Sequence, residues 1–117
     1  MAIQNWSDEI TVVELGDDPQ FTDELTTLMD NLEQKPVDVV LNFGAVSFIN
    51  SSNVSQLLRL RKLMSSKARK LVLCDVNTQV WGVFLVTGLD KIFEFTNDIA
   101  TALATLQLAD TDEEVGR

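Results

Sequence analysis

The sequence predicts an α/β fold, with a mixed, mostly parallel sheet of four to five strands packed with about four helices. Short apolar segments rich in β-forming residues alternate with segments of helical periodicity along the whole chain. The connections between them are short, as in right-handed crossovers that join parallel strands. The length of 117 residues suits one domain. We expect a single domain over residues 1–109, followed by an acidic, disordered tail over 110–117.

The first third of the chain predicts a strand or hairpin followed by a helix. Residues 10–15 are β-forming and lead into a turn-prone Gly-Asp-Asp-Pro sequence, and residues 3–6 can pair ahead of them as an edge strand. Residues 22–34 carry apolar side chains at spacings of three and four, which predicts a helix. Thr22 can cap this helix, and Pro36 limits its extension.

The middle of the chain predicts two buried strands with a helix between them. Residues 37–43 are nearly continuously apolar, as in a strand that is buried on both faces of a parallel sheet, so we expect this strand at the centre. The sequence Asn-Ser-Ser-Asn at 50–53 favours a turn and the start of a helix that runs from about 52 to 66. Residues 71–76 repeat the pattern of a buried strand.

The last third of the chain predicts two more helices and a short strand. Asn77 and Thr78 can cap a third helix, and Gly88 can close it. Residues 92–95 predict a last short strand, and residues 98–108 have the periodicity of a fourth helix.

The composition excludes several classes of function. Eighteen acidic and nine basic residues give a net charge of −9, so the surface repels phosphate backbones and nucleic acid is not an expected partner. The chain has no histidine and no tyrosine, which excludes Ser-His-Asp triads, Cys-His pairs and histidine-ligated zinc. No glycine-rich phosphate-binding motif occurs. We therefore expect no enzyme activity, no catalytic residue, no metal and no cofactor. In the alternative of a small α/β enzyme, Asp75 and Asp90 near element ends would be the candidate carboxylates.

The single cysteine and the hydropathy indicate a cytoplasmic protein. Cys74 lies in an apolar strand, so it is expected to be a buried structural thiol in a reducing compartment. The first residues lack the features of a signal peptide, and no apolar run approaches the roughly 18 to 20 residues of a membrane span, so we expect no membrane insertion.

The segment 37–58 carries the most informative motif, which is a buried strand, a short apolar continuation, a polar hinge with two serines and then a helix. This segment resembles a STAS domain, the fold of bacterial anti-sigma-factor antagonists. The family's Asp-Leu-Ser-like triplet corresponds to residues 41–43, and its Asp-Ser-Ser-Gly motif to residues 50–53. Later STAS blocks match residues 70–76 and 86–93. The resemblance covers about residues 8 to 108.

The resemblance implies a regulatory protein that binds an anti-sigma factor, which is itself a serine kinase, and that a serine phosphatase resets. The serine that this kinase modifies corresponds to Ser51, with Ser52 as the second choice. A phosphate at a helix N-terminus gains from the helix dipole and would repel a docked partner. The alternative from the residue types alone is that Ser51 and Ser52 only cap the helix.

Two departures from the family motif favour a second interpretation. These are Asn50, which stands at the motif's acidic position, and Asn53, which stands at its glycine position. The acidic position of the first triplet also carries an asparagine, Asn42. Without these carboxylates, kinase access can be altered while docking is kept. The alternative function is therefore a constitutive STAS adaptor subunit of a transporter or sensory complex that is not phosphorylated.

The expected partner-binding surface is the hinge and the start of the following helix, with a second patch at Trp81 and Leu85, one helical turn apart. Another helix or the second subunit of a homodimer could equally cover that patch. The hinge residues assigned to partner binding are Phe48, Asn50, Ser51, Ser52, Asn53 and Ser55.

A basic segment at 59–70 holds six of the nine basic residues and no acidic residue. It is either a contact for an acidic partner or a nucleotide phosphate, or a solvated helix face and turn.

Overall fold

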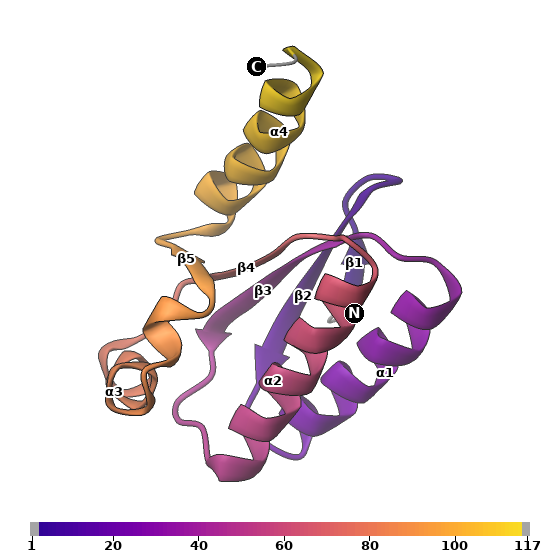
Figure 1. The fold of residues 1–117 in the computed structure, drawn as a ribbon. Helices are drawn as coiled ribbons and strands as arrows, with labels where there is room; N and C mark the ends of the chain where they lie inside the picture. Colours follow the sequence, from indigo (N-terminus) through magenta and orange to yellow (C-terminus); the bar gives the residue numbers. More distant parts are fainter. Residues whose placement is uncertain (1–2, 116–117) are drawn as a thin grey trace.

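The computed structural model describes the backbone of residues 3–115 and the side chains of residues 3–108. Within this part of the chain, five strands form one sheet in the order β1-β2-β3-β4-β5 (Figure 1). The elements are, in chain order, β1 (Ile3–Asn5), β2 (Ile10–Gly16), α1 (Gln20–Gln34), β3 (Asp38–Ala45), α2 (Ser51–Ser66), β4 (Leu71–Cys74), α3 (Thr78–Thr87), the short 3-10 helix η1 (Leu89–Lys91), β5 (Glu94–Thr96) and α4 (Ile99–Val115).

The sheet is mixed and mostly parallel, as the sequence predicts. β1 runs antiparallel to β2, while β2, β3, β4 and β5 are parallel to one another. β3 lies at the centre, where Val40 is opposite Val12 on one side and Val72 on the other. Each parallel pair is joined by a crossover that contains a helix, so the carboxyl ends of four strands meet at one edge.

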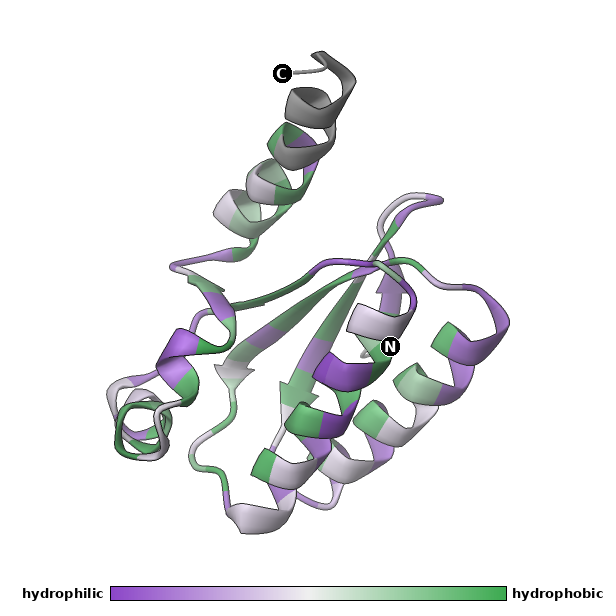
Figure 2. Ribbon diagram, viewed as in Figure 1, coloured by the Kyte–Doolittle hydropathy of each residue, from purple (hydrophilic) through white to green (hydrophobic). Residues whose placement is uncertain are grey.

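Apolar side chains alternate between the two faces of the sheet and build a core on each. On one face, Leu41 and Phe43 pack under α1, α2 and α3. On the other face, Val40 and Val72 pack under α4, which contributes Ala102. Figure 2 shows the apolar strands between the helices, whose outward sides carry more polar residues. The central strand is therefore buried on both faces, as its continuous apolar sequence requires.

An aromatic cluster fixes α3 against the sheet. The rings of Phe43 and Phe84 meet edge to face with centroids 6.1 Å apart, and Phe84 also packs on Phe95 of β5 at 5.1 Å. Asn77 caps α3 by accepting from the Val80 N–H at 2.8 Å. The Asn77 cap confirms the predicted start of this helix. The ring contacts hold the helix against β3 and β5.

The start of α1 differs from the prediction, because Thr22 does not cap this helix. Pro19 occupies the cap position, and Thr22 lies inside the first turn. The Asp18 carboxylate accepts both the backbone N–H of Thr22, at 3.0 Å, and its hydroxyl, at 2.7 Å. The Asp18 carboxylate, just ahead of the helix, therefore accepts from a backbone N–H of the first turn, the capping role that the sequence predicted for Thr22.

The last strand and the last helix are also displaced from their predicted bounds. Gly88 adopts a left-handed conformation with φ of 77°, and the chain continues into η1, so β5 begins at Glu94 instead of residue 92. Helix α4 continues to Val115, beyond the predicted end at 108, because no proline or glycine interrupts residues 99–115. The expected tail at 110–117 overlaps this helix; residues 116–117 lie outside the described residues, and the domain limit at 109 stays a prediction.

A buried carboxylate joins the start of β3 to the end of the basic segment. Asp38 is buried, and its Oδ1 accepts from the Lys70 backbone N–H at 3.0 Å. The same oxygen lies 3.0 Å from Arg69 Nε, which has no hydrogen-bond partner among the described residues, so this contact is an ion pair. Arg69 also reaches the exposed Glu9, at 3.5 Å. The arrangement ties the β1–β2 hairpin, β3 and the loop before β4 together at the amino-terminal ends of the strands.

The two acidic partners of Arg69 are expected to differ in their contribution to stability. Asp38→Ala leaves the Arg69 charge partly buried and the Lys70 N–H without its acceptor, so we expect the free energy of unfolding in urea at pH 7 to fall by about 2 kcal/mol. Glu9→Gln is the control, since the Glu9 side chain is 69% exposed and should change stability by less than about 0.5 kcal/mol. Equal effects of the two variants would contradict this assignment.

Candidate functional site

The predicted hinge lies at the carboxyl edge of the sheet, between β3 and α2. In Figure 1 this connection forms the lower rim of the molecule, below the ends of β2 and β3. The β2–α1 loop lies beside it, because the Asp17 carboxylate accepts from the Ser47 backbone N–H at 2.8 Å. The start of α3 is attached from the other side, where Asn77 Nδ2 donates to the Val46 carbonyl oxygen at 2.9 Å. Two neighbouring loops therefore hold the hinge, one from each side.

Helix α2 is capped by two asparagines and not by the serines between them. Asn50 Oδ1 accepts from the Asn53 backbone N–H at 2.9 Å, and Asn53 Oδ1 accepts from the Asn50 backbone N–H at 3.1 Å. These reciprocal bonds form a complete capping box. The alternative that Ser51 and Ser52 cap the helix is therefore wrong. Both serines are exposed, and neither hydroxyl has a hydrogen-bond partner among the described residues.

Asp18 is a site residue that the sequence analysis missed. Asn53 Nδ2 donates to Asp18 Oδ2 at 3.0 Å, so the second half of the capping box is bound to the β2–α1 loop. The pKa of the Asp18 carboxyl is lowered below its ordinary value of 3.8. The largest cause is the hydrogen bond from Asn53, followed by the hydrogen bonds from Thr22, with a smaller effect from Asn50. The signal in the sequence was the pair of adjacent acids directly after the first parallel strand, at the edge where such sites form.

The structure divides the predicted partner-binding residues into three groups. Phe48 is 60% exposed and Ser55 is exposed on the first turns of α2, so both are accessible beside the serines. Asn53 is 3% exposed, so it supports the hinge from inside. Trp81 is half-buried and packs edge to face on Phe95 of β5, whereas Leu85 is exposed. The last two therefore do not form one exposed patch.

The basic segment is partly used within the molecule. Lys67 pairs with Glu33 of α1 at 3.7 Å, and Arg69 pairs with Asp38. Arg61 Nε donates to the Ile92 carbonyl oxygen at 3.4 Å, and Arg59 and Lys62 are exposed on α2. The segment therefore fastens α2 to its neighbours as well as presenting charge to solvent.

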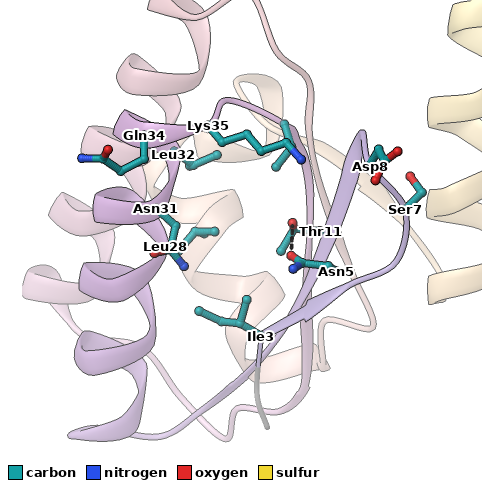
Figure 3. Close-up of a pocket in the computed structure, with 11 residues that line it drawn as sticks. Ile3, Asn5, Ser7, Asp8, Thr11, Leu28, Asn31, Leu32, Gln34 and Lys35 are labelled. Atoms are coloured by element: carbon teal, nitrogen blue, oxygen red, sulfur yellow. Dashed lines mark hydrogen bonds between the residues drawn. The ribbon is translucent and has the colours of Figure 1, made fainter.

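A cavity of about 320 Å³ lies between α1 and the β1–β2 hairpin, at the edge opposite to the hinge. In Figure 3, Leu28 and Leu32 of α1 lie across the cavity from Asn5 and Thr11, and Ile3 of β1 lies at its lower end. The Thr11 hydroxyl donates to Asn5 Oδ1 at 3.2 Å. No residue that we predicted for the functional site lines this cavity. The cavity and the hinge are thus separate features.

The cysteine is buried, and the acidic side chains do not gather into a metal site among the described residues. Burial, followed by the charges of Asp75 and Asp98, raises the pKa of the Cys74 thiol to about 11, so this thiol is a poor nucleophile at neutral pH. Within residues 3–108, no group of three His, Cys, Asp or Glu side chains could hold a metal ion. Among the helices of the described residues, none is long and apolar enough to cross a membrane.

Comparisons with known proteins agree with this architecture. The family model of the STAS domain matches residues 8–102. A candidate anti-sigma factor antagonist of Bordetella bronchiseptica, BtrV, is 30% identical over 98 residues, which are 84% of this chain and 82% of that protein.

Solved structures share the fold at lower identity. A candidate anti-sigma factor antagonist of Thermotoga maritima superposes with a TM-score of 0.80 at 18% identity, over 90% of this chain and 92% of that one. The Bacillus cell fate determinant SpoIIAA in its phosphorylated form superposes with a TM-score of 0.70 at 20% identity, over 88% of this chain and 96% of that one.

The family match spans most of the chain, and the order of strands and helices is the one that the apolar periodicity predicted, apart from the added η1. The chain therefore belongs to the STAS domain family of anti-sigma-factor antagonists.

Proposed function

We propose that this protein is a non-enzymatic regulatory switch, an anti-sigma-factor antagonist whose unmodified form binds an anti-sigma factor kinase and whose phosphorylation at Ser51 ends that binding. The proposal rests on the accessibility of Ser51. Its hydroxyl is exposed at the first position of α2 and has no hydrogen-bond partner among the described residues, since Asn50 and Asn53 cap the helix. A kinase can therefore reach the hydroxyl without unfolding the hinge.

A phosphate on Ser51 would be stable where it forms. The backbone N–H groups of the first helical turn point toward this position, and the helix dipole favours negative charge there. The domain then need not change its fold to change its partner. SpoIIAA, which has the same fold, has been solved in unphosphorylated and phosphorylated forms, which supports a switch of this kind.

The exposed residues around Ser51 suit a protein interface. Phe48 supplies an aromatic anchor on the approach to the hinge, and Ser52 and Ser55 surround the modified position with small polar groups. A charge of about −1.5 to −2 introduced at the centre of this surface adds repulsion and desolvation cost in the complex. We propose a cytoplasmic protein with two partners, the anti-sigma factor kinase and a serine phosphatase that resets Ser51, and without enzymatic activity of its own.

The switch is tested by affinity capture from native lysate with ATP or ADP, using wild-type, Ser51→Ala and Ser51→Glu baits, followed by titration calorimetry with the purified kinase. We expect Ser51→Ala to bind the kinase as wild type does and to take up no phosphate. We expect Ser51→Glu to bind roughly 30- to 150-fold more weakly, which corresponds to about 2 to 3 kcal/mol.

Ser52→Glu is the matched control, because it places the same charge one residue further along the same exposed turn. It should weaken binding less than Ser51→Glu, and phosphopeptide mapping should find the modification on Ser51. Identical partners and affinities for all baits would instead identify a constitutive adaptor in which Ser51 has no regulatory role.

The support of the hinge is tested separately with Asn53→Ala. This change removes the bond to Asp18 and half of the capping box, so we expect the free energy of unfolding at pH 7 to fall by about 1 to 2 kcal/mol. We also expect the pKa of Asp18 to rise toward its ordinary value of 3.8, measured by NMR titration of the carboxyl carbon.

The pH dependence follows from the sign of that pKa shift. Because folding lowers the pKa of Asp18, its stabilising contribution is present above pH 3.8 and is lost as the pH falls through the lowered pKa. The difference in stability between wild type and Asn53→Ala should therefore narrow in acid. Ser52→Ala is the control and should change stability by less than about 0.5 kcal/mol. An unchanged Asp18 pKa in Asn53→Ala would show that the bond does not persist in solution.

A further inference from the structure

A second cavity lies at the carboxyl ends of β4 and β5, on the same edge of the sheet as the hinge. Its volume is about 240 Å³. Sites for small-molecule ligands usually measure roughly 300 to 1,000 Å³. The cavity is therefore better matched to one side chain of a partner protein than to a whole metabolite. Its lining residues are Asp75, Val76, Trp81, Phe95, Thr96 and Asn97.

Two aromatic rings form one wall of this cavity. Trp81 of α3 and Phe95 of β5 meet edge to face, with centroids 5.0 Å apart and ring planes at 86°. Both side chains are half-buried, so their positions are fixed while part of each ring faces the cavity. Ring faces carry partial negative charge, which attracts a cation.

A single carboxylate provides the charge. Asp75 is the only charged residue that lines the cavity; it is exposed, and its side chain has no hydrogen-bond partner among the described residues. Its backbone is left-handed, with φ of 60°. Gly44 at the end of β3 leaves room for the carboxylate, since a Cβ at Gly44 would lie 2.6 Å from Asp75 Oδ2.

We propose that this cavity receives the guanidinium group of an arginine side chain on the protein that docks at the hinge. A guanidinium can pair with the Asp75 carboxylate and stack on Trp81 at the same time, whereas an ammonium is more strongly hydrated and lacks a flat face. An anion would be repelled by Asp75 and by the net charge of −9.

The position of the cavity suits a partner that also covers the hinge. Asn77, in the loop that follows Asp75, donates to the Val46 carbonyl oxygen at the approach to the hinge. The loop that carries Asp75 is therefore joined directly to the approach to the hinge, so the cavity lies close to it at the same edge of the sheet. The inference rests on the proposed function only for the identity of the protein that supplies the arginine.

The test uses a blocked arginine, N-acetyl-arginine methylamide, titrated into the full-length ¹⁵N-labelled protein and followed by NMR. We expect weak, saturable shifts at the Trp81 indole N–H and at the backbone amides of Asp75 and Asn97. Blocked citrulline, which keeps the shape but not the charge, should bind at least roughly tenfold more weakly, and blocked lysine should also bind more weakly.

Two variants locate the binding group. Asp75→Asn should weaken arginine binding at least roughly tenfold while keeping the fold, because asparagine tolerates the left-handed backbone. Gly44→Ala keeps every charge but displaces the Asp75 carboxylate, so it should weaken binding as well. Asp90→Asn is the control, since Asp90 does not line the cavity, and should leave the affinity within about twofold.

Equal binding of citrulline, unchanged binding by Asp75→Asn, or shifts centred away from the cavity would each overturn the proposal. These outcomes do not depend on Ser51. A protein that binds blocked arginine but whose Ser51→Glu variant keeps its partner would refute the phosphorylation switch and leave the arginine site standing.

Discussion

The burial of β3 on both faces is the constraint on which the rest of the structure depends. Val39, Val40, Leu41 and Phe43 are all fully buried, so helices must cover the sheet from both sides. Here the covering helices lie in crossover connections, which join parallel strands. Parallel strands all have their carboxyl ends at the same edge of the sheet. The hinge, the β2–α1 loop and the loop before α3 meet at that edge because of this geometry. The core thus determines where the protein can present its polar, functional groups.

At this edge, amide groups and one carboxylate support the hinge. The reciprocal cap between Asn50 and Asn53 satisfies the first turn of α2, and the free amide hydrogens of Asn53 bind Asp18. A second carboxylate at position 50 would lie beside Asp18 and raise its pKa through like-charge repulsion. The two asparagines that depart from the family motif therefore fit beside the Asp18 carboxylate: Asn53 donates to it, and Asn50 adds no like charge next to it. Since these asparagines cap the helix, the Ser51 hydroxyl is not needed for a capping hydrogen bond.

Charged side chains are distributed unevenly around the hinge and the sheet edge. The basic segment neutralises acidic groups on other elements through Lys67 and Arg69, which leaves Arg59 and Lys62 exposed along α2. The edge at β4 and β5 carries the opposite sign, since Asp75 and Asp98 both act on the buried Cys74 thiol. A protein that docked across the hinge would therefore meet acidic groups on the α3 side and basic groups further along α2. Such complementarity affects the rate and specificity of association more than its strength.

The sequence by itself determined the fold class, the central place of β3 and the asparagine cap of α3, because apolar periodicity and capping residues act locally. It also placed Ser51 at the start of α2. Only the tertiary structure decided what surrounds these elements. Asp18 reaches Asn53 across thirty-five positions of the chain, Thr22 loses its predicted capping role to Asp18, and Trp81 turns toward Phe95 instead of forming a patch with Leu85. These contacts join residues that are distant in sequence, so they depend on how the crossovers pack at the sheet edge, which no local pattern encodes.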